Sequence, residues 1–168
     1  VEVDHWALLA SARLLPHVEK CSIPNIRERL IAHAVQQCET IVRTQIVNTD
    51  NPARFGAFHA DGRTTPASTR LEGLLAALTF LPAEHDILRE WVTAATGCGL
   101  EFLLHAQIRQ GPHRGGMPRA MPATTDETAD SDMNSDRRAS EIRIDYVQHA
   151  LSAMIQAREL YQLEEAAR

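Results

Sequence analysis

Residues Thr69 to Pro82 read TRLEGLLAALTFLP, and this stretch decides the fold. Its leucines stand at positions 71, 74, 75 and 78, a spacing that places side chains on one face of an α-helix. Thr69 and Glu72 form a capping-box pattern, which marks a helix start. Pro82 cannot continue a helix, because it lacks an N–H group. The sequence therefore predicts a helix that begins at Thr69 and ends before Pro82.

Four further segments carry apolar residues at helical spacing, over about residues 3–15, 25–46, 86–108 and 140–164, with Ser140 as the cap of the last one. No segment alternates apolar and polar residues as a half-buried strand does. We therefore predict an all-α fold of about five main helices. The faces expected to be buried are Trp6, Leu9, Ala10 and Leu14 in the first helix, Ile26, Leu30, Ala34, Cys38, Ile41 and Val42 in the second, Leu88, Trp91, Val92, Ala95, Phe102 and Leu103 in the fourth, and Ile144, Val147, Leu151, Met154, Ile155 and Leu160 in the fifth.

Two connections are too long to be simple turns, since most connections in compact domains have about 4–6 residues. One covers residues 47–68 and the other residues 109–140. The second contains residues 124–136, which are rich in Thr, Asp and Ser and have no apolar periodicity. We expect a mobile acidic insertion there. All 168 residues are expected to form one α-helical domain.

The second and fourth helical segments repeat each other at a constant spacing. Arg27-Glu28 falls on Arg89-Glu90, and Gln45-Ile46 falls on Gln107-Ile108. The following loops share arginine, glycine and alanine, and the third and fifth segments open alike. A unit of helix, long loop and helix therefore occurs twice behind a first helix. The matched stretches are Arg54 to Ala60 with Arg114 to Ala120, and Arg70 to Leu74 with Arg143 to Val147.

A helical hairpin that recurs cannot bury its apolar face alone and must stack on copies of itself. The repeat end, a Gln followed by a loop and then Gly-Ala-Phe or Gly-Gly-Met, resembles that of the α/α-toroid superfamily, and sugar-acting six-hairpin enzymes are the nearest in character. The resemblance implies half a toroid, as the C-terminal part of a larger ring. The chain begins at Val1, directly in the first predicted helix. We expect a fragment, a processed chain, or a domain that a partner chain or missing domain completes.

The resemblance implies that the long loops form the rim of a central funnel. Arginines beside helix N-termini favour an anionic ligand there, because free N–H groups and the helix dipole attract negative charge. The expected ligand is an anionic small molecule or oligosaccharide. Alternatively, these arginines pair with Asp61, Asp126 or Asp130. The basic residues expected at this mouth are Arg54, His59, Arg63, Arg70, Arg114, Arg119 and Arg143.

Three residues are candidates for proton transfer. Glu72 and Asp145 hold the same repeat position, as a pair of acid/base carboxylates in sugar chemistry would. His149 follows Asp145 by one helical turn, so the carboxylate can support the imidazole. The alternatives are structural: Glu72 belongs to the capping box, Asp145 suits a first helical turn, and His149 is an ordinary helix histidine.

Aromatic residues are candidates for stacking on a sugar ring, or else they fill the core; they are Trp6, Phe55, Phe58 and Tyr146. No zinc-binding motif has the required spacing, so we predict no metal and no cofactor. The three cysteines form no CxxC pair, which favours a reducing, cytoplasmic compartment.

Charge and length exclude two classes of partner. A net charge of −5 and a pI near 5.9 argue against nucleic acid, whose phosphates need a basic face. The apolar stretch from Gly73 to Pro82 is far shorter than the roughly 20 residues that cross a bilayer, so no membrane is expected. Two functions stay open: binding or processing of an anionic carbohydrate by epimerase, lyase or hydrolase chemistry, and a non-catalytic helical domain that docks on a partner.

Overall fold

The computed structural model describes residues 3–121 and 138–166. The predicted all-α class is confirmed, because this part of the chain contains no strand and only two isolated β-bridges. The insertion expected over residues 124–136 lies outside the described residues. The described helices are α1 (His5–Leu14), α2 (Ile26–Arg43), α3 (Thr64–Leu78), α4 (Asp86–Ala106) and α6 (Ile144–Ala166), with 3-10 turns η1 (Leu15–Lys20), η2 (Pro52–Arg54) and η3 (Ala83–His85).

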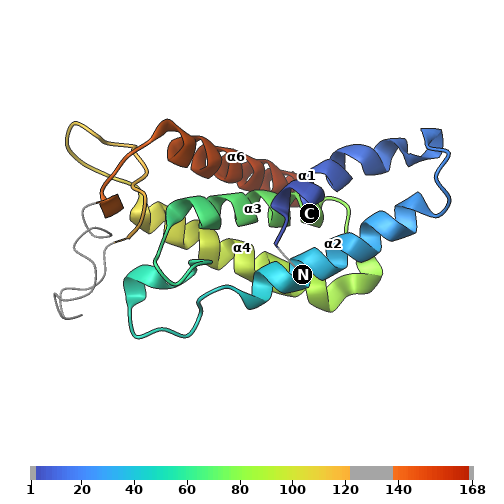
Figure 1. The fold of residues 1–168 in the computed structure, drawn as a ribbon, viewed down its shortest axis with the longest axis horizontal. Coiled ribbons are helices and arrows are strands. Elements are labelled where there is room, and N and C mark those ends of the chain that lie inside the picture. The colour runs from blue at the N-terminus through green and yellow to red at the C-terminus, as the bar shows by residue number, and fades with distance from the viewer. Residues whose placement is uncertain (1–2, 122–137, 167–168) are drawn as a thin grey trace.

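The helices form two layers (Figure 1). We call the layer of α1, α3 and α6 the inner layer and the layer of α2 and α4 the outer layer. In the inner layer, α3 packs against α1 on one side and against α6 on the other. In the outer layer, α2 and α4 pack against each other and against the inner helices α1 and α3. Most side chains of α3 are buried, as expected for a helix with neighbours all round. The apolar stretch of the sequence is therefore the centre of the core.

The long and short connections lie at opposite ends of the molecule (Figure 1). At the end with the short connections, the two hairpin turns are held by equivalent arginines of the outer helices. An Arg27 Nη donates to the Leu15 carbonyl at 3.3 Å, and an Arg89 Nη donates to the Leu81 carbonyl at 2.6 Å. The two arginines match in the sequence repeat, so the repeat extends to these hydrogen bonds.

The two long loops are closed by the same pair of backbone hydrogen bonds. The Gly56 N–H donates to the Ile46 carbonyl, and the Ile46 N–H donates to Ala57, both at 2.8 Å. In the second copy of the repeat unit, the Gly115 N–H donates to the Ile108 carbonyl at 2.8 Å, and the Ile108 N–H donates to the Gly116 carbonyl at 3.0 Å. Both closing glycines are left-handed, with φ of +83° and +88°. The predicted loop repeat is thus present in the backbone.

The register of this loop repeat differs by one residue from the sequence alignment. The alignment pairs Gly56 with Gly116, whereas the hydrogen bonds pair Gly56 with Gly115. The reason is loop length, because the glycine follows its glutamine by 11 residues in the first copy and by 8 in the second. The corrected register also matches the buried Phe58 with the buried Met117.

The predicted start of α3 is wrong by more than one turn. The helix begins at Thr64, where the Thr64 N–H donates to the Arg119 carbonyl at 2.9 Å and the hydroxyl to the Pro118 carbonyl at 2.6 Å. Thr69 is inside the helix, and its hydroxyl donates to the Thr65 carbonyl at 3.1 Å. The capping box therefore does not form. In the same way α6 begins at Ile144, after the predicted Ser140.

The predicted buried faces hold for most of α4 and for α2 from Ala34 onward, but Ile26 and Leu30 of α2 are only half-buried, and the predicted faces of α1 and α6 are wrong. In α6 the buried side chains are Tyr146, Ala150, Ala153 and Ala157, and in α1 they are Leu8 and Ser11. Small residues let α6 approach α3 closely, which turns the larger side chains outward. Large apolar side chains expected in the core are exposed instead; they are Trp6, Leu14, Trp91, Ile144, Leu151 and Ile155.

Candidate functional site

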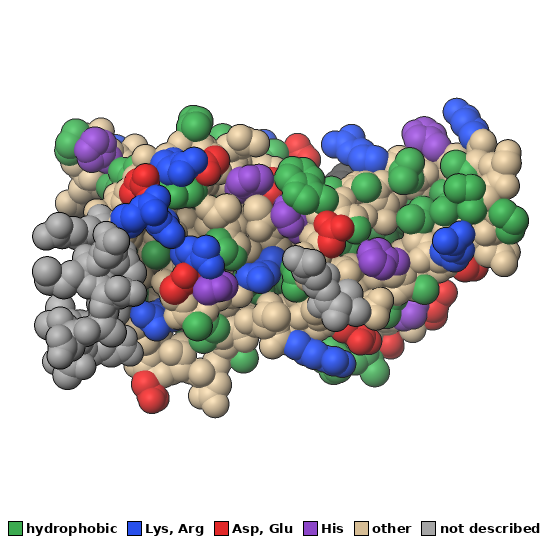
Figure 2. Space-filling view, in the orientation of Figure 1, with side chains coloured by type: hydrophobic (Ala, Val, Ile, Leu, Met, Phe, Trp, Pro, Cys, Tyr) green, Lys and Arg blue, Asp and Glu red, His purple; other side chains and the backbone are tan. Residues whose placement is uncertain are grey.

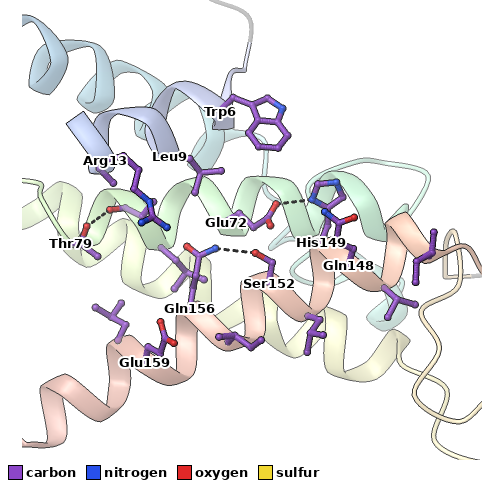
Figure 3. Close-up of a pocket in the computed structure, with 18 residues that line it drawn as sticks. Trp6, Leu9, Arg13, Glu72, Thr79, Gln148, His149, Ser152, Gln156 and Glu159 are labelled. Atoms are coloured by element: carbon purple, nitrogen blue, oxygen red, sulfur yellow. Dashed lines mark hydrogen bonds and ion pairs between the residues drawn. The ribbon is translucent and has the colours of Figure 1, made fainter. Parts of the chain in front are cut away.

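A groove runs between α1 and α6, with α3 as its floor, and has a volume of about 950 Å³ (Figure 3). We call it the inner groove, because all of its lining residues belong to the three inner helices or the residue that follows α3. Its walls are largely apolar, with Leu9 from α1, Leu75 from α3 and Leu151 from α6. Apolar clefts with a few polar groups are the usual form of a ligand site.

The polar centre of the inner groove is a hydrogen-bonded pair of side chains, Glu72 and His149. Glu72 Oε2 lies 2.9 Å from His149 Nδ1, and the two side chains are 7% and 17% exposed (Figure 3). A carboxylate accepts a hydrogen bond from Nδ1–H, which leaves Nε2 of a neutral imidazole as a proton acceptor. The pair therefore has the geometry of a supported general base, with Glu72 as its positioning group.

Two residues of α1 complete this cluster. Trp6 is 59% exposed, and its ring lies edge-on to the His149 ring with centroids 6.4 Å apart. His5 approaches α3 at Gly73, where a Cβ would lie 3.0 Å from the His5 Cβ. Burial lowers the pKa of His5; the nearby Glu72 charge raises it and His149 lowers it. His5 is thus a titratable neighbour of the pair.

Sequence reasoning missed His5. His5 and Glu72 are far apart in the chain, and only the packing of α1 on α3 brings the Glu72 charge near enough to affect the pKa of His5. The one sequence signal is Gly73, since a glycine inside a helix often permits a close helix contact.

The structure does not place Asp145 with Glu72 and His149. Asp145 is the second residue of α6, where its Oδ1 lies 3.0 Å from Arg143 Nε, and it is half exposed. The Asp145 carboxylate raises the pKa of Arg143. Glu72 instead lies in the third turn of α3. The two acidic residues that match in sequence therefore differ in depth, and the support predicted for His149 comes from Glu72.

A second cavity, of about 310 Å³, lies where the long loops meet the starts of α3 and α6. We call it the arginine pocket, after four of its lining residues: Arg63, Arg119, Arg138 and Arg143. Figure 2 shows basic side chains, with acidic ones among them, gathered at this end of the molecule. Tyr146, Asp145 and the first turn of α3 complete the lining.

Three arginines of this pocket already have acidic partners. Arg63 pairs with Asp61, Arg138 with Glu141, and Arg143 with Asp145, all through exposed or half-exposed side chains. The side chain of Arg119 has no ion-pair or hydrogen-bond partner among the described residues. The Arg143 guanidinium also lies 5.5 Å from the centroid of the Tyr146 ring. Of the predicted acidic partners only Asp61 pairs with an arginine here, while Asp126 and Asp130 lie outside the described residues.

The remaining predicted binding residues lie outside both cavity linings. Arg70 donates from Nη1 to the Phe58 carbonyl at 2.5 Å, and burial, with the nearby Arg63 charge, lowers its pKa. His59 accepts from Arg63 at 3.0 Å and contacts Asp61. Arg54 belongs to η2 in the first long loop. Phe58 is in the core, Phe55 is half-buried, and Arg114 is exposed in the second loop.

Comparison with protein-family models, with curated proteins and with solved structures finds no match for this chain. In residues 3–121 and 138–166, no group of three or more His, Cys, Asp or Glu side chains is arranged to hold a metal ion. None of the helices that the structure describes has the length and apolar character needed to cross a membrane. The site must therefore be interpreted from its own geometry.

Proposed function

We propose that the chain is part of an α/α toroid that binds and processes an anionic carbohydrate in the inner groove. Two features support the toroid: the inner layer of α1, α3 and α6 with α2 and α4 outside it, and the repeated closure of the long loops. In such a ring the inner groove faces the central funnel.

The observation that carries the proposal is the Glu72–His149 pair in the inner groove. Epimerase, lyase and hydrolase reactions on sugars all need a group that takes or delivers a proton. His149 supplies that group through Nε2, while Glu72 holds Nδ1 and fixes the ring orientation. Trp6, exposed beside the pair, offers a flat apolar face for a sugar ring.

The acidic group of the ligand would bind in the arginine pocket. Asp145 lines this pocket and His149 lines the inner groove, four residues further along α6. A rise of 1.5 Å per residue separates them by about 6 Å along the helix axis, roughly the width of a sugar ring. Arg119 and Arg143 can therefore hold a carboxylate while the ring reaches His149.

The test is calorimetric titration of the full chain with uronate oligosaccharides. We expect binding, and we expect the double variant Arg119→Ala with Arg143→Ala to weaken it at least about tenfold, since charge-assisted contacts are the strong ones. Arg29→Ala, an exposed arginine on α2, is the matched control and should bind like the wild type. Equal affinity in the double variant would remove the arginine pocket from the proposal.

A second experiment tests the chemistry. If His149 takes a proton from carbon, uronate oligosaccharides incubated in heavy water should exchange the hydrogen next to the carboxylate. His149→Gln should stop the exchange, while Gln148→Ala, on the same groove, should not. Binding without exchange would favour hydrolase chemistry over epimerase or lyase chemistry.

The second candidate function, a helical domain that docks on a partner, is favoured by the exposed apolar side chains. Leu14 and Leu151, on α1 and α6, are 50% and 54% exposed, and large exposed apolar patches mark interaction sites. Sedimentation of the chain tests this: a stable monomer whose first and last helices are fully protected from hydrogen exchange would count against it.

A further inference from the structure

We propose that the outer edge of α6, together with the loop before it, is a docking surface for one more outer helix that presents a backbone carbonyl and a small residue, as α4 does. This edge surface consists of Gln107, Gly115, Met117, Val147, Leu151 and Met154, which line a cavity of about 210 Å³. The proposal rests on the toroid that is part of the proposed function, and not on its carbohydrate chemistry, because it locates where the toroid would continue. It is drawn from the first repeat copy, where the matching surface is covered.

In the first copy, α4 lies directly on the closed loop. A Cβ on Gly56 would be 2.0 Å from the Cys98 carbonyl oxygen, so only a glycine allows this approach. Gln45 Nε2 spans the contact, since it donates to the Gly56 carbonyl at 3.1 Å and to the Ala95 carbonyl of α4 at 2.8 Å. The loop glycine and the glutamine thus act together to seat an outer helix.

Small residues on α4 make its other contacts to this surface. A Cβ on Gly99 would lie 2.8 Å from Leu71 Cδ2 and 3.0 Å from Phe58 Cε2. Phe58 occupies the position of Met117 in the corrected register. The helix that covers the first copy is therefore recognised by its lack of bulk at Gly99 and by the carbonyls of Ala95 and Cys98.

In the second copy the same parts are present without a cover among the described residues. Gly115 has a left-handed φ like Gly56, yet among the described residues, its two chain neighbours apart, no atom lies within 4 Å of where its Cβ would be. Gln107 Nε2 reaches the Gly115 carbonyl at 3.4 Å, as Gln45 reaches Gly56. The acceptor that matches Ala95 is not found in the described part of the chain, so the second Nε2 hydrogen of Gln107 is available to a docking helix.

The edge surface is uncharged and largely apolar, which limits the kind of helix that can dock on it. None of its residues carries a charge, and the Leu151 side chain is 54% exposed, so the partner face must be neutral and apolar. In a second molecule of this chain, the outer helix that could dock on the edge surface is α2. However, α2 carries His33 and Gln36 where α4 has Ala95 and Cys98. Side chains of that size block the close approach. A helix with the small residues of α4 is the occupant that fits.

The experiment continues the full chain beyond Arg168 with a copy of residues 79–106, which include η3 and α4. Thermal unfolding of the chain and of the extended chain is compared. Because stacked repeats gain stability from each new interface, the extension should raise the midpoint by at least about 4 °C. Gly115→Ala should lower the midpoint by about 2 °C in the chain but by more than about 8 °C in the extended chain, where the helix needs the glycine.

A matched control places Gly99→Leu in the copied helix alone, which should abolish the gain because bulk at this position prevents close packing. The proposal is overturned if Gly115→Ala lowers the midpoint equally in both chains, or if the control extension raises the midpoint as much as the unaltered one. It is also overturned if the rise in midpoint depends on protein concentration, which would indicate docking of a second molecule. Because the measurement involves no carbohydrate, its failure leaves the uronate titration unaffected, and failure of that titration leaves the edge surface standing.

Discussion

The two long loops have the same backbone hydrogen bonds but different surroundings. The loop of the first copy is covered by α4, while no helix that the structure describes covers the closing glycine of the second loop. The acidic positions of the two copies differ in the same way, since Glu72 is buried and Asp145 is half exposed. Residues that match in the repeat therefore need not contribute equally to the free energy of unfolding. Burial decides how much each hydrogen bond or ion pair contributes.

The largest difference between the copies is expected at the closing glycines. Gly56→Ala should destabilise the chain by more than about 3 kcal/mol, because it combines a left-handed φ with a clash against the Cys98 carbonyl. Gly115→Ala meets the φ strain without the clash and should cost about 1 kcal/mol. Urea unfolding of both variants measures the difference. Equal losses in the free energy of unfolding would mean that α4 moves away from the added methyl group at little cost. The comparison of the two loops would then fail.

The acidic positions should differ by a smaller amount. Glu72→Ala leaves His149 Nδ1 without its partner in a mostly buried place, so we expect a loss of about 2 kcal/mol. Asp145→Ala removes an exposed ion pair and should change the free energy of unfolding by less than about 0.5 kcal/mol. The same denaturation measurement checks both variants. A cost for Asp145→Ala as large as that for Glu72→Ala would contradict the assignment of Glu72 as the partner of His149.

The glutamines form the next pair. Gln45→Ala removes two hydrogen bonds to carbonyls, one of them across to α4, and should cost about 1.5 kcal/mol. Gln107→Ala removes one long, exposed bond and should cost less than about 0.5 kcal/mol. Hydrogen exchange at the Ile46 N–H should accelerate in the first variant, since the loop closure loosens. Unchanged exchange there would show that Gln45 does not hold the loop.

The sequence predicts the helices and their repeat because both depend on local patterns. Proline positions, helical spacing and the matched Arg and Gln residues lie within one helix or one loop, and all of them recur in the structure. The start of α3 was missed for the opposite reason. Thr64 is held by the carbonyls of Pro118 and Arg119, more than fifty residues away, so no local pattern marks it.

The candidate site was only partly predictable. The sequence predicts Glu72 and His149 as site residues but not their pairing, because Asp145 is the nearer carboxylate in sequence while α3 packs on α6 through small residues. The faces of α1 and α6 were assigned by the rule that large apolar residues are buried. That rule fails where alanines make the close contact and leave leucine and isoleucine outside. Packing of one helix on another decides both outcomes.

The smallest expected effect is a shift in the titration of His5, followed by NMR of the imidazole signals. Burial is the largest influence on the pKa of His5 and lowers it from 6.5, while the Glu72 charge raises it and Asp4, His149 and Arg70 act as further charges. Glu72→Gln removes the nearby negative charge, so the pKa of His5 should fall further, whereas Asp145→Asn should leave it unchanged.

Since the folded pKa lies below the unfolded value, His5 contributes stability that is complete above the ordinary pKa and is lost as pH falls through the folded pKa. In Glu72→Gln this loss should be larger and should extend to a lower pH, because the folded pKa lies further below the ordinary one. A His5 titration that responds equally to both variants would place Asp145 within reach of the inner groove and remove the distinction between the two acidic positions.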